Sequence, residues 1–92
     1  MDLSTGKWIQ RLRQKLGLSQ VQFAQLFGVH FMTVSKWERD ALPPSAYQLV
    51  LMQQFAETAA AKQDQAAKEV KNLLVGAGVV AALIWLLTAA KK

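Results

Sequence analysis

Side chains that bind or transform ligands are sparse in this sequence, and most of those present are basic. The chain has no cysteine and a single histidine, so it offers no thiol nucleophile, no cysteine zinc site and no cluster of imidazole ligands. Its six acidic residues are scattered, and no nucleophile–base pair, carboxylate dyad or glycine-rich phosphate loop is discernible. We therefore expect no enzymatic activity, no cofactor and no metal site. We interpret His30 as a helix cap or a phosphate neighbour.

The basic residues give the chain a mild positive bias. Eleven lysines and arginines face six acids, for a formal net charge of +5. The first 56 residues hold six bases and three acids, residues 57–72 are balanced, and Lys91 and Lys92 add the remaining two charges. Phosphate contacts dominate affinity for nucleic acid, and five of the bases are available to make them. These five are Lys7, Arg11, Lys15, Lys36 and Arg39.

Short helices must position these residues, and local signals predict where the first two lie. Residues 7–15 place apolar side chains at helical spacing, and Gly17 is a stop signal. Ser19 and Gln22 have the spacing of a capping box, in which each side chain bonds the other residue's backbone amide. This predicts a second helix over 19–27 that ends at Gly28.

Two further helices are predicted by the same reasoning. The third begins near His30 and stops around Asp40, since Pro43 and Pro44 cannot continue it. Ser45 and the glutamine three residues later repeat the capping-box pattern and predict a fourth helix. No alternation typical of strands occurs, so the sequence predicts an all-α fold.

The second and third helices have the arrangement of a helix-turn-helix, with Gly28 and Val29 between them. On spacing alone this signal is weak, but many separated positions resemble the Xre family of Cro/cI-repressor-like helix-turn-helix domains. The resemblance covers about residues 7–55 and implies a lambda-repressor-like bundle of four to five helices. The positions that carry it are 9–20, Phe23 and Ala24, Gly28 and Val29, 33–39, and Pro44 and Ser45.

The resemblance also implies roles for individual residues. The helix over 30–39 would lie in the major groove of double-stranded DNA, with its first residues at base edges. Arg13 and Glu38 match a family pair that often forms a structural ion pair. The DNA-contacting positions implied are His30, Phe31, Met32, Thr33 and Lys36 at the bases, and Gln20 and Arg39 at the phosphates.

Phe31 and Met32 depart from the family pattern, which usually has polar residues there. Three interpretations remain open for this pair. The apolar side chains could contact thymine methyl groups, form a patch that binds a protein partner, or pack in the core. The first two interpretations imply different functions for the same helix.

The C-terminal part of the chain contains a long apolar run. Residues 73–90 carry no charge, which meets the usual length threshold for a membrane-spanning helix, and lysines lie on both sides of the run. We therefore predict a helix-turn-helix unit over 1–57, a helical juxtamembrane linker over 58–72 and a transmembrane helix over 73–90. Together the last two would form one long C-terminal helix that contacts lipid. The alternative is a helix buried in a soluble oligomer.

These predictions combine into a leading hypothesis with two alternatives. We expect a single-pass inner-membrane protein with a cytoplasmic, DNA-reading N-terminal domain, a transcriptional regulator that dimerises through a ridge formed by Gly78 and Ala82. The first alternative is a tethered scaffold whose head binds a protein, a layout that resembles the cell-shape protein RodZ. The second is a soluble antitoxin-like repressor that oligomerises through its C-terminal helix.

Overall fold

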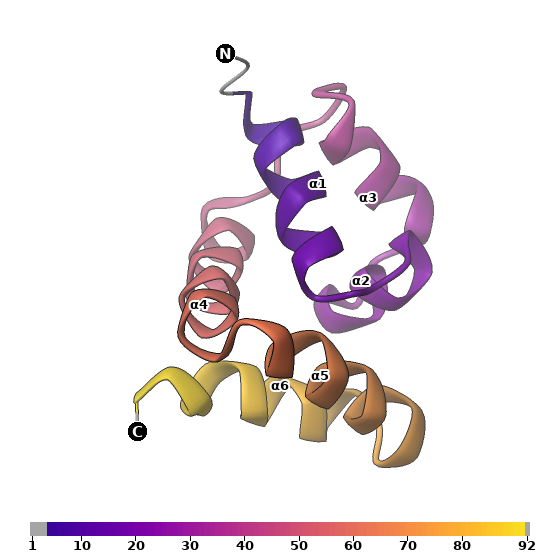
Figure 1. Cartoon of the computed structure of the whole chain (residues 1–92). Coiled ribbons are helices and arrows are strands. Elements are labelled where there is room, and N and C mark those ends of the chain that lie inside the picture. Colours follow the sequence, from indigo (N-terminus) through magenta and orange to yellow (C-terminus); the bar gives the residue numbers. More distant parts are fainter. Residues whose placement is uncertain (1–3, 92) are drawn as a thin grey trace.

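The computed structural model describes residues 4–91, and that part of the chain is entirely helical (Figure 1). Residues 1–3, at the start of the predicted 1–57 unit, and Lys92, one of the flanking lysines, lie outside it. The all-α prediction is confirmed within the described range. The elements are α1 (Thr5–Lys15), α2 (Gln20–Phe27), α3 (Phe31–Glu38), α4 (Ala46–Lys62), α5 (Asp64–Gly76), α6 (Val79–Thr88) and a terminal 3₁₀ turn, η1 (Ala89–Lys91).

The local signals for the first four helices are confirmed. Ser19 and Ser45 each cap a helix through a reciprocal bond with the glutamine three residues on, and this box satisfies two otherwise unpaired amides. Gly28 ends α2 with φ of 64°, in the left-handed region that glycine adopts without steric cost. The helix-turn-helix geometry therefore follows from residues read directly in the sequence.

Aromatic side chains hold the first four helices together. The ring of Phe27 at the end of α2 lies 5.0 Å from Phe23, 5.6 Å from Trp37 of α3 and 5.5 Å from Phe55 of α4, measured between centroids. These are distances at which tilted and edge-on ring pairs are favourable. Phe23, Phe55 and Trp37 are buried, so this cluster fixes α3 against α2 and α4.

The start of α1 meets the end of α3 at very short range. A Cβ added at Gly6 would lie 2.5 Å from the Glu38 carbonyl oxygen and 2.7 Å from that of Trp37. The amide of Gly6 donates to Oδ1 of Asp40 at 2.9 Å. Only glycine permits this approach, which sets α1 in place beside the second helix of the helix-turn-helix.

The predicted long C-terminal helix is wrong, because the chain breaks twice. Gln63 has φ of 45° and ψ of −120°, which ends α4 and turns the chain into α5. Gly78 has φ of 104°, and its amide donates to the Leu73 carbonyl oxygen at 2.7 Å. The second break makes α5 and α6 a helical hairpin that underlies the rest of the bundle in Figure 1.

The hairpin buries much of the apolar run inside the molecule. α6 packs against α5, α4 and α2. Leu86 is fully buried, and its carbonyl oxygen accepts a hydrogen bond from Oγ1 of Thr58, which is 1% exposed. Ala82 is also fully buried, so this half of the ridge predicted at Gly78 and Ala82 packs within the chain, whereas the position of a Cβ at Gly78 meets open space.

The membrane prediction is corrected by these findings. Within residues 4–91, no helix combines the length and the apolar character needed to cross a membrane. The predicted transmembrane helix over 73–90 is therefore wrong, and so is the single-pass inner-membrane localisation that rested on it. The run is uncharged throughout, but Gly78 divides it between α5 and α6.

Candidate nucleic-acid interface

A largely buried ion pair joins α1 to α3, the second helix of the helix-turn-helix. Nε of Arg13 donates to Oε2 of Glu38 at 2.6 Å, and Nη2 donates to Oε1 at 3.1 Å. The side chains are 14% and 4% exposed, respectively. Two parallel charge-assisted bonds of this kind combine strength with a fixed orientation. This geometry is the one that the family resemblance implies for these two positions.

Gln20 and Leu18 each add a hydrogen bond to the Arg13–Glu38 ion pair. Nε2 of Gln20 donates to Oε1 of Glu38 at 3.1 Å, and Nη1 of Arg13 donates to the Leu18 carbonyl oxygen at 2.9 Å. The network therefore joins α1, the start of α2 and the end of α3. The bond to Glu38 was not anticipated from the sequence, because a glutamine at a helix start gives no signal for a partner 18 residues away.

His30 forms the N-cap of α3. Its Nδ1 accepts a hydrogen bond from the Met32 amide at 3.1 Å, so in this tautomer Nε2 carries the proton and is a donor. The centroid of the imidazole ring also lies 4.6 Å from the centroid of the Phe31 ring, and the two ring planes are inclined by 33°. These contacts hold His30 and Phe31 at the entrance of the helix that is predicted to read DNA.

Phe31 and Met32 both face solvent. Their side chains are 41% and 45% exposed, respectively, whereas Val34 and Trp37 carry the apolar contacts of α3 to the core. This excludes core packing as the explanation for the two apolar residues. The other two interpretations, contact with thymine methyl groups and contact with a protein partner, are not decided by this exposure.

One outward face of α3 carries three of the seven residues predicted to contact DNA. Met32, Lys36 and Arg39 are spaced i, i+4 and i+7, so they lie along the same side of the helix. Nε of Arg39 donates to the Ser35 carbonyl oxygen at 3.3 Å, which draws its guanidinium along the helix. Ser35 shares this face and was missed from the sequence, although its i+3 spacing from Met32 was a readable signal.

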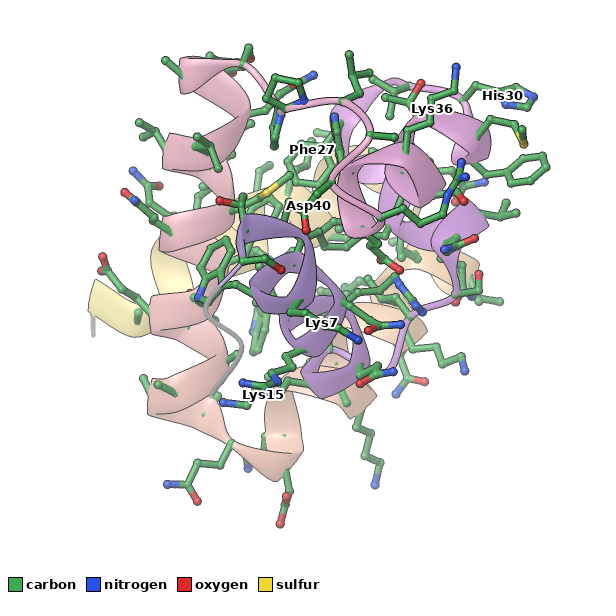
Figure 2. All side chains as sticks on the ribbon, turned by 90° about the horizontal axis from the view of Figure 1, so that it is seen from above. Lys7, Lys15, Phe27, His30, Lys36 and Asp40 are labelled. Atoms are coloured by element: carbon green, nitrogen blue, oxygen red, sulfur yellow. The ribbon has the colours of Figure 1, made fainter. Side chains whose placement is uncertain are left out.

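Other predicted residues lie apart from that face. Thr33 is half-buried on the opposite edge of α3 from Phe31. Figure 2 shows His30 and Lys36 at one edge of the molecule, whereas Lys7 and Lys15 project from α1 well away from them. Lys7 and Lys15 therefore do not share one basic surface with Lys36, and the α3 face is the part that lies on the second helix of the helix-turn-helix.

Comparison with known proteins identifies one part of the chain. A helix-turn-helix family model matches residues 9–56, from within α1 to within α4, and leaves the hairpin of α5 and α6 outside the match. No curated protein and no solved structure matches the chain. In residues 4–91, no group of three or more histidine, cysteine, aspartate or glutamate side chains is placed to hold a metal ion.

Proposed function

Because the chain belongs to the helix-turn-helix family, whose model covers residues 9–56, we propose that it is a DNA-binding transcriptional regulator. In this proposal α3 enters the major groove of double-stranded DNA. The observation that carries it is the outward face of α3, on which Met32, Lys36 and Arg39 are aligned and exposed. In helix-turn-helix proteins the N-terminal residues of this helix meet the base edges while the preceding helix crosses the backbone.

We assign each side chain a contact to a phosphate or to a base edge according to its hydrogen-bonding groups and charge. The Nε2–H of His30 is a donor suited to a phosphate or to a base edge at the start of α3. Lys36 and Arg39 supply positive charge for phosphates, with Gln20 at the start of α2 as a neutral donor. The Arg13–Glu38 ion pair and the bond from Gln20 to Glu38 tie the start of α2 and the end of α3 to α1, which supports the relative placement of these groups.

A titration of labelled duplex DNA with the full chain, followed by fluorescence anisotropy, tests the proposal. We expect affinity to fall with rising salt, with a log–log slope of about −3 to −5 for a few neutralised phosphates. Replacing Lys36 by alanine should weaken binding to every sequence and reduce the slope by about 1. Lys68→Ala in α5 is the matched control, because it removes the same charge from an exposed position outside the family match.

Two results would count against DNA binding by α3. One is the absence of any salt-dependent binding at low ionic strength. The other is an equal loss of affinity in the Lys36 and Lys68 variants, because that would indicate a diffuse attraction to the net positive charge.

A protein partner at the same helix is a second candidate, favoured by the exposed Phe31 and Met32. Apolar side chains that remain in solvent are characteristic of protein-binding sites as well as of contacts to thymine methyl groups. A photocrosslinker at position 31 separates the two in cells. It should capture DNA if the chain is a regulator and a protein if the helix is a docking element.

A further inference from the structure

One side of α1 lies beside α4 and carries an aromatic ring followed by two positive charges. Trp8, Arg11 and Lys15 are spaced i, i+3 and i+7, so they lie along the same side of the helix. Trp8 is 37% exposed, and both basic side chains are exposed as well. Tryptophan and arginine are two of the residue types that contribute most binding energy in protein interfaces. This stripe of α1 therefore has the composition of a contact surface.

The stripe borders a groove along the boundary between α1 and α4. Three cavities of about 320, 210 and 470 Å³ lie there. The first two share Trp8, and the last two share Lys15 and Ala59, so they form one continuous depression, which we call the α1–α4 groove. On the α4 side the second and third cavities are lined by Ala56, Ala59 and Ala60, whose small side chains leave room for side chains of another molecule.

The positive charges at the groove are not neutralised within residues 4–91. The one ion pair in that range involves neither Arg11 nor Lys15. Among the described residues, Asp64 is the single acid that lines the groove, at the end next to α5. Lys7 lies one turn before Arg11, and like charges four residues apart destabilise a helix. A bound anion would relieve that repulsion, so the charges of α1 favour a negatively charged occupant.

The apolar parts of the groove narrow the class of occupant further. The phosphate backbone of DNA would pair with Arg11 and Lys15, but it offers no apolar group to the indole of Trp8 or to the alanines of α4. An amphipathic helix that carries acidic residues offers both kinds of group. The rise along α1 from Trp8 to Lys15 is about 10.5 Å, which two turns of a partner helix match.

We propose that the α1–α4 groove binds an acidic amphipathic helix of a partner protein. Apolar side chains of that helix pack on Trp8 and on the alanines of α4, as anchors spaced i, i+4 and i+7 do in other helix-binding grooves. Its carboxylates pair with Lys15 and with Arg11, whose guanidinium can donate two parallel bonds. No residue of α3 lines the three cavities, so the partner leaves the proposed DNA-reading face uncovered.

Fluorescence anisotropy of a labelled synthetic peptide, titrated with the full chain, tests the proposal. The peptide has about 18 residues, enough to form a helix in isolation, with leucines on one face and glutamates beside them. A second peptide has glutamine in place of every glutamate. We expect the acidic peptide to bind with a Kd of about 1–100 µM and more weakly as salt rises. The glutamine peptide should bind at least about tenfold more weakly.

Two variants test the charged and the apolar parts of the groove separately. Arg11→Glu should weaken binding of the acidic peptide about tenfold or more. It should preserve folding, because an acid there lies four residues from both Lys7 and Lys15. Trp8→Ala should also weaken binding about tenfold, but without changing how steeply affinity falls with salt. Circular dichroism verifies that each variant is folded.

Lys71→Glu is the matched control for the charge reversal. Lys71 is exposed on α5 and lines none of the three cavities, so this variant should change peptide affinity by less than about twofold. An equal loss in the Lys71 and Arg11 variants would overturn the proposal, because it would indicate attraction to net charge. Acidic and glutamine peptides that bind equally well, or unchanged binding in the Arg11 and Trp8 variants, would overturn it too.

Duplex DNA binding by the same variants separates a partner helix from a second phosphate contact on α1. Arg11→Glu should lower the affinity for duplex DNA no more than Lys71→Glu does. If Arg11→Glu weakens DNA binding more than it weakens peptide binding, the groove is a phosphate-binding surface and the proposal is overturned. A chain that binds the acidic peptide but no DNA would refute the proposed function and support this inference.

Discussion

The buried carboxylate of Glu38 links three helices, because its partners lie on α1 and α2. It accepts three hydrogen bonds, two from Arg13 and one from Gln20. Glu38→Ala would leave the guanidinium of Arg13, which is 14% exposed, without its counter-charge. We expect the free energy of unfolding to fall by about 2–4 kcal/mol, measured by urea denaturation.

Glu57→Ala provides the comparison for that measurement. Glu57 is exposed on α4, so its removal should change stability by no more than about 0.5 kcal/mol. Equal effects of the two substitutions would show that the ion pair does not brace the helices.

The exposed apolar pair at the start of α3 gives a prediction about sequence preference, which rests on the proposed function. In duplexes selected for binding, replacing a contacted thymine by uracil removes only the methyl group. We expect each such replacement to weaken binding about fourfold, from the loss of roughly 0.8 kcal/mol of apolar contact. Phe31→Ala and Met32→Ala should abolish this sensitivity.

The controls for this experiment distinguish the absence of thymine recognition from the absence of DNA binding. Uracil at positions outside the protected site should have no effect. Tight binding that is indifferent to the methyl group throughout would refute thymine readout while leaving DNA binding intact.

Several residue-level features of the candidate site could be predicted from the sequence. Capping boxes and the stop at Gly28 are local, so pattern reasoning found them. The pairing of Arg13 with Glu38 spans 25 positions and followed only from the family resemblance. The bond from Gln20 to the same carboxylate depends on where α2 meets α3, and no local pattern encodes that.

At the element scale, prediction worked for α1–α4 and failed for the C-terminal hairpin. An uncharged run of 18 residues satisfies the length criterion for a membrane span, but that criterion measures hydropathy alone. The break between α5 and α6 occurs at Gly78, whose φ is 104°. It also depends on α4, which offers α6 an apolar face to pack on.

Gln63 offers a test of the break between α4 and α5. Its φ of 45° with ψ of −120° is a conformation that a side chain disfavours and glycine adopts readily. Gln63→Gly should therefore raise the free energy of unfolding by about 1 kcal/mol, visible as a higher midpoint in thermal unfolding.

Gln53→Gly is the matched control, because Gln53 is an exposed glutamine inside α4 with helical backbone. It should lower stability by about 1 kcal/mol. If both substitutions destabilise the protein, the turn at Gln63 is not strained.

At the scale of the whole molecule, the helix-turn-helix match and the C-terminal hairpin share one core. The core cluster runs from Ile9 through Phe55 to Leu86 without interruption, and Thr58 donates to the backbone of α6. A chain ending at residue 62 would expose the face of α4 that α5 and α6 cover. We expect it to lose cooperative thermal unfolding and to bind an apolar dye.

A milder variant tests the same dependence without removing the hairpin. Leu86→Ala leaves a cavity beneath α4 and should cost about 2–4 kcal/mol, since Leu86 is fully buried. Ile84→Ala on the exposed side of α6 should cost much less. Similar losses for the two residues would mean that α6 is not anchored as described.

The order of the helices along the chain also affects when this bundle can finish folding during synthesis. Helices α1–α4 leave the ribosome before α6, which packs on α2 and α4. Until α6 emerges, the growing polypeptide carries an uncovered apolar surface, the kind of species that aggregates or engages chaperones. Slow translation through the codons of α5 and α6 should therefore lower the yield of native protein more than an equal delay within α1.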